Sequence, residues 1–211
     1  MGARPPPPEP AHIFVYGTLR PAYARMAGSS ATMNPPTLLH DLCRHVGEAT
    51  LHGYALVHLG AYPAIIPAPP PARVIGDVYA LPSPPPAGAM ATLDAYEGIG
   101  DEFPPPQEYR RVAATVVLAR SEKGGGGGDG GGGGGDRTTD TRPGGEGGGG
   151  GDRTLPAWIY VYLWATDGGT VIDGGDWLGW IAARAAAGGG PEAGPRSAVG
   201  VPAADDSKKG V

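Results

Sequence analysis

The sequence predicts one domain of mixed α+β class. Segments in which side chains alternate between two faces, the pattern of β-strands, recur along the whole chain. Segments with a helical pattern are few and short, and they do not alternate with strands in the way that βαβ units would. Once the low-complexity stretches are set aside, roughly 150 residues remain, which is enough for one domain with a core of its own.

Low-complexity stretches account for most of an unusual composition. Glycine (39) and proline (25) together make up about 30% of the 211 residues, a level typical of disorder. We expect a disordered proline-rich N-terminus over 1–11, a domain over 12–187 and a disordered tail over 188–211. The tract Gly124–Gly151 holds 18 glycines in 28 residues and cannot offset its own ordering entropy. We therefore interpret 124–151 as a disordered insertion inside the domain.

Five segments are expected to form strands, and each has its own signature. The first is apolar on both faces, as in a central strand, and the third contains Gly76, which indicates a bulge or a close backbone approach. The last has one face of tryptophans and tyrosines and one aliphatic face, so the glycine tract separates two strands that should be neighbours. In order, the predicted strands are His12–Tyr16, His52–Leu59, Val74–Leu81, Arg111–Ala119 and Trp158–Trp164.

Three short helices are predicted, over Leu38–Val46, Ala87–Glu97 and Trp177–Ala187. The second is the most informative, because Gly98 stands where a glycine commonly ends a helix. Met90, Leu93 and Glu97 follow the helical spacing i, i+3 and i+7, so they share one face. If Met90 and Leu93 point into the core, Glu97 points the same way.

Charge and composition exclude several classes of function. The net charge is −5 and no basic cluster is present, so nothing favours binding to nucleic acid or to an anionic membrane. The sequence contains no run of eighteen apolar residues, the length that spanning a membrane requires. Cys43 is the only cysteine, which excludes an intramolecular disulfide and a zinc site built on cysteines. We expect a cytoplasmic protein.

Glu97 admits two interpretations. A glutamate near the C-terminus of a helix is often a solvated surface residue, and there it opposes the helix dipole. Its place on the apolar face points instead to a desolvated carboxylate, whose pKa would rise toward neutrality as a general base requires. Two interpretations also exist for the segment Tyr16–Leu19. It is either an ordinary turn after a strand or a bend at Gly17 that directs consecutive N–H groups at an anion.

Taken in order, seven short segments resemble the gamma-glutamylcyclotransferase-like family, which includes the AIG2-like plant proteins. Each segment is weak evidence alone, but their shared order over about residues 12–180 is specific. The segments are Phe14–Arg20, Gly60–Ala64, Val74–Tyr79, Leu93–Gly98, Tyr109–Arg111, Ala157–Tyr162 and Gly175–Trp177.

The resemblance implies a small β-barrel flanked by short helices, with a pocket at one end. It implies that Tyr16, Gly17, Thr18 and Leu19 grip the substrate through backbone N–H groups and that Glu97 is the catalytic acid/base. Tyr62 would also bind substrate, Tyr109 and Arg111 would shape the pocket, and Tyr160 or Tyr162 would line it. No metal or cofactor is implied, and the partner is a small γ-glutamyl compound.

The implied reaction is intramolecular. The α-amine of a γ-glutamyl compound attacks its own γ-carbonyl, which releases an amine and forms 5-oxoproline. A non-catalytic ligand-binding or stress-response module of the same fold is the alternative, and a different acyl-transfer activity in the same pocket is a third possibility. The segment Pro21–Met33 is longer than the glycine-containing turn usual in the family, and it is expected to border the pocket. The leaving amine therefore stays open.

Overall fold

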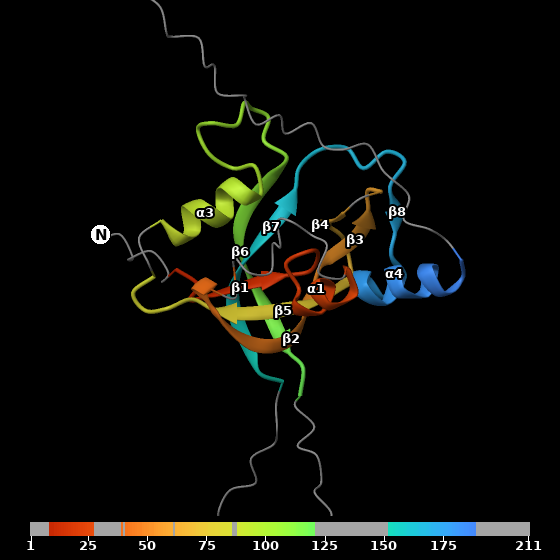
Figure 1. Ribbon diagram of the computed structural model, residues 1–211, viewed down its shortest axis with the longest axis horizontal. Helices are drawn as coiled ribbons and strands as arrows, with labels where there is room; N and C mark the ends of the chain where they lie inside the picture. Colours follow the sequence, from red (N-terminus) through yellow and green to blue (C-terminus); the bar gives the residue numbers. More distant parts are fainter. Residues whose placement is uncertain are drawn as a thin grey trace, which may run out of the picture.

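A closed five-stranded barrel forms the centre of the molecule (Figure 1). The computed structural model describes residues 9–27, 39, 41–60, 62–85, 88–120 and 152–188. Around the barrel the strands follow the order β1 (His12–Val15), β5 (Arg73–Ala80), β2 (Arg44–His52), β6 (Tyr109–Leu118) and β7 (Thr154–Tyr162). A separate three-stranded sheet has the order β4 (Pro63–Pro67), β3 (Tyr54–His58) and β8 (Thr170–Val171). The predicted α+β class and the small barrel are confirmed.

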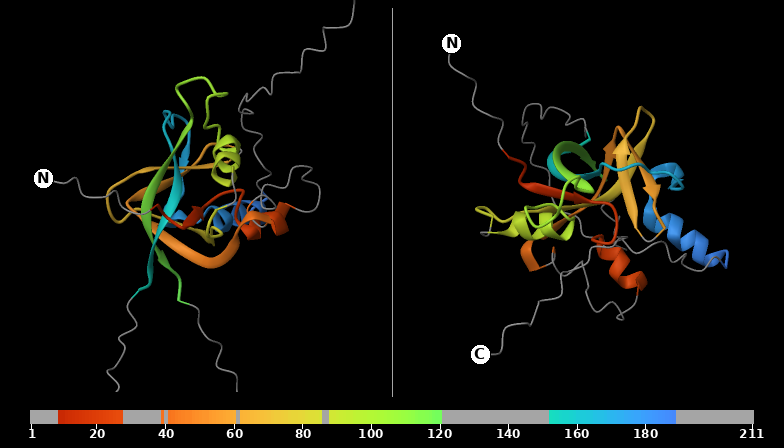
Figure 2. Two further views of the ribbon diagram at one scale, coloured as in Figure 1. Left: turned by 90° about the vertical axis from the view of Figure 1, so that its left-hand side faces the viewer. Right: turned by 90° about the horizontal axis from the view of Figure 1, so that it is seen from above.

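One parallel contact closes the barrel. Ile13 of β1 pairs with Trp158 of β7 in parallel, whereas the other neighbouring strands are antiparallel. The longest hairpin ladder joins β6 and β7, from the pair Tyr109–Tyr162 at one end to Val117–Thr154 at the other (Figure 2). The two strands on either side of the glycine tract are thus neighbours, as the sequence predicts. The tract itself lies outside the described residues.

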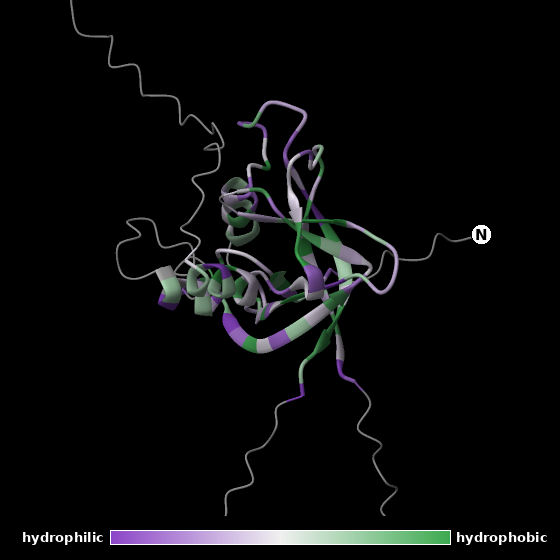
Figure 3. Ribbon diagram, turned by 90° about the vertical axis from the view of Figure 1, so that its right-hand side faces the viewer, coloured by the Kyte–Doolittle hydropathy of each residue, from purple (hydrophilic) through white to green (hydrophobic). Residues whose placement is uncertain are grey.

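Alternation along the strands divides the buried residues into two clusters. On β7, Ile159 and Val161 belong to a cluster that includes Phe14 of β1, whereas Tyr160 and Tyr162 belong to a second cluster. The second cluster also holds residues of β1 and the helix after β5, so β1 and β7 are buried on both faces. Hydrophobic residues accordingly gather on the strands at the centre of the molecule, whereas hydrophilic ones lie on the connections and also along β2 (Figure 3).

The helices flank this barrel. They are α1 (Pro21–Ala27), α3 (Ala89–Tyr96) and α4 (Trp177–Ala186), with a short 3₁₀ turn η1 (Asp173–Gly175) before α4. α3 and α4 lie on opposite sides of the barrel (Figures 1 and 2). The predicted helices at 87–97 and 177–187 are therefore confirmed to within two residues. None of the helices in the described ranges has the length and apolar character that crossing a membrane requires.

Two sequence predictions are wrong in part. Of the helix expected over Leu38–Val46, Leu38 and His40 lie outside the described residues and Leu39, Asp41 and Leu42 are helical, but β2 starts at Arg44 and pairs with β5 along its length. The strand expected over His52–Leu59 is two strands, since Gly53 forms a turn with a φ of 81° between β2 and β3. The close backbone approach predicted at Gly76, in contrast, is confirmed. A Cβ atom there would lie 2.3 Å from the Val15 carbonyl oxygen.

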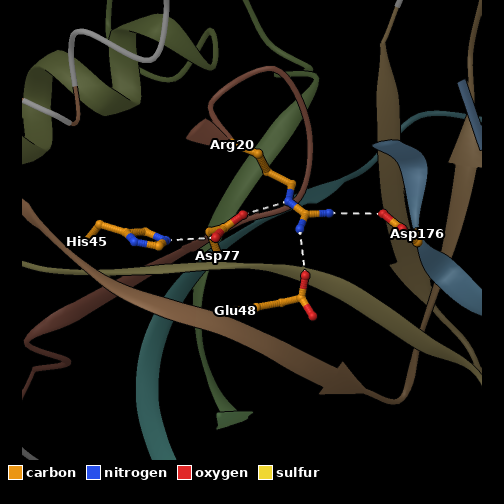
Figure 4. Close-up of polar contacts among 5 residues, drawn as sticks. All are labelled: Arg20, His45, Glu48, Asp77 and Asp176. Atoms are coloured by element: carbon orange, nitrogen blue, oxygen red, sulfur yellow. Dashed lines mark hydrogen bonds and ion pairs between the residues drawn. The ribbon is translucent and has the colours of Figure 1, made fainter. Parts of the chain in front are cut away.

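The loop that follows β1 is anchored by a buried arginine (Figure 4). Arg20 is 5% exposed, and its Nε donates to Asp77 Oδ2 of β5 at 2.7 Å. Its Nη1 donates to Asp176 Oδ1 at 3.0 Å, and its Nη2 donates to Glu48 Oε2 of β2 at 3.2 Å. His45 Nε2 lies 2.7 Å from the second oxygen of Asp77. One guanidinium thus connects the loop after β1 with two barrel strands and the residue that precedes α4.

Replacing Arg20 by methionine should lower the free energy of unfolding by about 3–5 kcal/mol. The substitution keeps the apolar stem but leaves the buried Asp77 carboxylate with only the His45 imidazole beside it, and a buried carboxylate that loses its guanidinium partner is strongly destabilising. Urea unfolding followed by tryptophan fluorescence measures the loss. Arg120→Met is the matched control, because Arg120 faces Asp152 at 3.5 Å with both side chains about 70% exposed. Such a pair contributes less than about 1 kcal/mol. Equal losses in the two variants would contradict the anchoring role.

Candidate functional site

A cavity of about 380 Å³ lies between the end of β1, the C-terminus of α3 and the first residues of β6. Segments that are far apart in the sequence contribute to it, among them the loop after β1, the residues that open β4 and the middle of β7. Its described lining residues are Phe14, Val15, Tyr16, Gly17, Thr18, Leu19, Tyr62, Pro63, Tyr96, Glu97, Gly98, Glu108, Tyr109 and Tyr160. Eight of the nine residues that the sequence predicts for the site are therefore brought together.

The end of α3 fixes the position of Glu97. Gly98 has a φ of 71° and its N–H donates to the Ala95 carbonyl at 3.1 Å, while the Ile99 N–H donates to the Asp94 carbonyl at 2.8 Å. These two bonds form the Schellman motif, which satisfies the last carbonyls of a helix. Leu93, on the same face, is fully buried. Glu97 is half-buried and lines the cavity, so the predicted shared face is confirmed.

The Glu97 carboxylate has no stabilising partner in the described part of the chain. Among the described residues it makes no hydrogen bond and no ion pair. Burial first, and then the negative charges of Glu108 and Asp94, together raise its pKa from 4.5 to about 8. Desolvation and like charges both disfavour the ionised form of a carboxyl group. The side chain is therefore able to exchange a proton near neutral pH.

The loop Tyr16–Leu19 passes the cavity in a tight turn, in which the Arg20 N–H donates to the Gly17 carbonyl at 3.0 Å. Glycine is required at 17 because a Cβ atom would lie 2.8 Å from Pro63 Cγ. Within the described part of the chain, the N–H groups of Gly17, Thr18 and Leu19 donate to no protein atom. These three N–H groups are therefore available to donate hydrogen bonds to a ligand oxygen. The anion cradle that the sequence suggests remains a prediction.

Several tyrosines line the same cavity as Glu97. Burial raises the pKa of Tyr109 and of Tyr160 above the usual value of 10, and it also raises that of Tyr16. These three side chains stay protonated at neutral pH and can donate hydrogen bonds. Tyr16 donates to the Tyr160 carbonyl at 2.8 Å. The hydroxyl of Tyr62 donates to Glu108 Oε1 at 2.6 Å.

Arg111 does not line the cavity, which corrects its predicted place. Its Nη1 lies 2.8 and 2.9 Å from the two oxygens of Asp94, and its guanidinium lies 5.0 Å from the centre of the Trp158 ring. Asp94 in turn accepts a hydrogen bond from the Tyr160 hydroxyl at 2.9 Å. Arg111 reaches the cavity only through Asp94 and Tyr160. Of the two tyrosines offered as alternatives, Tyr160 lines the cavity, while Tyr162 packs edge-on against Tyr109.

The sequence prediction missed Glu108 and Tyr96. Glu108 directly precedes β6 and contributes the second carboxylate of the cavity. Tyr96 closes one side, with its hydroxyl 3.2 Å from Thr18 Oγ1. The only signal for Glu108 was a carboxylate placed immediately before a predicted tyrosine. Tyr96 does not share the helical spacing of Met90, Leu93 and Glu97, so the helical pattern gives no signal for it. No described His, Cys, Asp and Glu side chains gather as metal ligands would.

A small barrel flanked by short helices is the fold that the resemblance implies. The family model described as gamma-glutamyl cyclotransferase, AIG2-like, matches residues 13–126. The match spans more than half of the chain, and the chain belongs to this family. No curated protein matches the sequence.

Several solved structures are similar. The solution structure of protein ytfP from Escherichia coli is 23% identical, with a TM-score of 0.42 over 81% of this chain and 98% of that one. The uncharacterized protein PH0828 from Pyrococcus horikoshii is 15% identical, with a TM-score of 0.45 over 83% and 97% of the two chains. At5g39720.1 from Arabidopsis thaliana is 17% identical, with a TM-score of 0.40 over 83% of each.

Replacing Glu97 by glutamine should stabilise the fold at pH 7 by about 1–3 kcal/mol. The folded-state pKa of about 8 lies above the ordinary value of 4.5, so between these values the unfolded chain has lost the proton while the folded chain keeps it. Stability therefore falls as pH rises through this window, and glutamine removes that loss. Urea unfolding at pH 7 and pH 4 measures it, with the difference vanishing at pH 4. Equal stabilities at pH 7 would show that Glu97 is not desolvated.

Proposed function

We propose that this protein is a gamma-glutamylcyclotransferase-type enzyme. It converts the γ-glutamyl group of a small amide or peptide into 5-oxoproline and releases an amine. The observation that carries the proposal is the Glu97 carboxylate, which lines the cavity with no partner among the described residues and has a pKa of about 8. Family membership supports the same reaction class.

Glu97 transfers one proton from the attacking nitrogen to the departing nitrogen. Its carboxylate accepts the proton that the substrate's α-amine loses as the nitrogen attacks the γ-carbonyl carbon. A C–N bond forms, and the five-membered ring closes through a tetrahedral intermediate. Glu97 then gives the proton to the departing nitrogen, the old C–N bond breaks, and the amine leaves neutral. An acid/base group is most effective when its pKa is close to the operating pH, as that of Glu97 is.

The cavity walls supply position and hydrogen-bond donors. The N–H groups of Gly17, Thr18 and Leu19 would hold the substrate's α-carboxylate or the developing oxyanion, as donors fixed in advance do in other acyl transfers. The protonated hydroxyl of Tyr109 would donate to the γ-glutamyl group, and the Tyr160 hydroxyl oxygen, whose proton is donated to Asp94, would accept a hydrogen bond from it. Holding the amine near the carbonyl replaces an encounter by an intramolecular step, which provides a large share of the acceleration.

Arg111 enters this scheme as a positioning residue. It holds Asp94 through both carboxylate oxygens, and Asp94 holds the Tyr160 hydroxyl. The pair thus fixes the orientation of one wall of the cavity without contact with the substrate. Its own charge is neutralised by Asp94, so it contributes no cation to the site.

Glu97→Gln should abolish formation of 5-oxoproline, with a fall in kcat of about 10²–10⁴-fold, the usual contribution of a general acid/base. The assay uses a panel of γ-glutamyl amines and dipeptides, with 5-oxoproline measured directly. Glu102→Gln is the matched control, because Glu102 is exposed and lies outside the cavity. Turnover that survives Glu97→Gln would remove the proposed role. A wild-type protein without turnover on the panel would favour the ligand-binding module.

The pH profile of kcat/KM should show an acidic limb near pH 8. Only the ionised carboxylate can accept the amine proton, so the rate falls as pH drops below the Glu97 pKa of about 8. The groups that face it are Glu108 and Asp94, which raise this value, and tyrosines whose own pKa values are raised out of the window. Steady-state kinetics from pH 5 to 9 measure the limb. A midpoint between 4 and 5 would contradict the assignment.

A further inference from the structure

The cavity carries charge of one sign. Among its described lining residues the ionisable groups other than tyrosines are Glu97 and Glu108, and no lysine, arginine or histidine is present. Two buried or half-buried arginines of adjoining segments are occupied by carboxylates, Arg20 by Asp77, Glu48 and Asp176, and Arg111 by Asp94. A ligand in the cavity therefore meets the carboxyl groups of Glu97 and Glu108.

Glu108 is held in place from two directions. Its carbonyl accepts the Leu163 N–H at 2.9 Å, which continues the β6–β7 ladder by one residue. Its Oε1 accepts the Tyr62 hydroxyl at 2.6 Å. A bond from a neutral hydroxyl orients a carboxylate but does not cancel its charge. Both side chains are half-buried, where charge interactions are screened less than on the open surface.

The proposed reaction uses only one of the two carboxylates. Glu97 exchanges the proton between the two nitrogens, so Glu108 has no part in that transfer. Its charge nevertheless acts on any group nearby, as its effect on Glu97 shows. A positive group at Glu108 would be attracted and would also relieve the repulsion between the two carboxylates. A negative group there would be a like charge beside Glu108, and a third like charge whenever Glu97 is ionised, which is unfavourable in a half-buried site.

We propose that Glu108, oriented by Tyr62, is a specificity site for the leaving amine. It selects γ-glutamyl amides whose leaving amine carries a further cationic nitrogen, and it discriminates against those whose leaving amine carries a carboxylate. The inference rests on the proposed cyclotransferase function and narrows its substrate class.

Three substrates of matched shape test the charge preference. They are the γ-glutamyl amides of 1,4-diaminobutane, pentylamine and 5-aminopentanoate, in which the same four-carbon chain ends in an ammonium, a methyl or a carboxylate group. We expect kcat/KM of the wild type to fall in that order, by at least tenfold between the first and the last. In Glu108→Gln the ratio between the first and the last should fall at least tenfold, and Tyr62→Phe should reduce it less.

The ratio is the decisive readout, because a general loss of activity or of folding leaves it unchanged. Glu102→Gln is the matched control and should keep the wild-type ratio, and Glu108→Asp should restore part of it. Equal rates for the three substrates, or a preference that survives Glu108→Gln, would overturn the specificity site while leaving the cyclotransferase function standing.

Failure of the function itself gives a different result. If the wild type forms no 5-oxoproline from any of the three amides, titration calorimetry tests whether Glu108 still forms a cation site. It compares the affinities of the Glu97→Gln variant for 1,4-diaminobutane and for 5-aminopentanoate. Tighter binding of the diamine that is lost in the double variant with Glu108→Gln would support a cation site. Absence of that preference would overturn it.

Discussion

The geometry of the cavity depends on one buried cation. Arg20 directly follows the loop Tyr16–Leu19, and its guanidinium is surrounded by three carboxylates from β5, β2 and the residue before α4. Removing an arginine from water is costly, and the cost is offset only when its donors find charged acceptors in good geometry. The chain provides these acceptors from three separate segments. The loop therefore cannot shift without disturbing the barrel wall as well as the start of α4.

Two partly or fully buried ionisable side chains show opposite designs. Arg20 has each of its three nitrogens bonded to a carboxylate, which makes the ion cluster a structural element. Glu97 has no such partner among the described residues, and its neighbours Glu108 and Asp94 carry the same charge. Unfavourable environments of this kind are typical of functional carboxyls, since a shifted pKa is useful for proton transfer. Here the Arg20 ion cluster stabilises the loop Tyr16–Leu19, which lies beside the cavity where the ionised form of Glu97 is destabilised.

Sequence patterns located most of the barrel and the principal carboxylate. Alternation along β1, β5, β6 and β7 is strong because each of these strands buries aliphatic or aromatic side chains, and Gly98 marked the end of α3. β2 escaped prediction because its burial is confined to a few positions and its polar residues, Glu48 among them, serve the Arg20 cluster. The ion pair of Arg111 with Asp94 depends on where α3 packs against the barrel. No local pattern contains that information, and the same holds for the bond between Tyr62 and Glu108.

The β6–β7 ladder separates two parts of the molecule that differ in how much their sequence can change. The pair Tyr109–Tyr162 stands at the cavity, and Val117–Thr154 stands at the far end, beside the glycine tract. At about 3.4 Å per residue the eight steps between them span roughly 27 Å. A change in the length of the connection there leaves the register at the cavity fixed by the intervening pairs. Natural variation, or a domain inserted by design, can therefore be accommodated at this hairpin end without passing a distortion to Glu97.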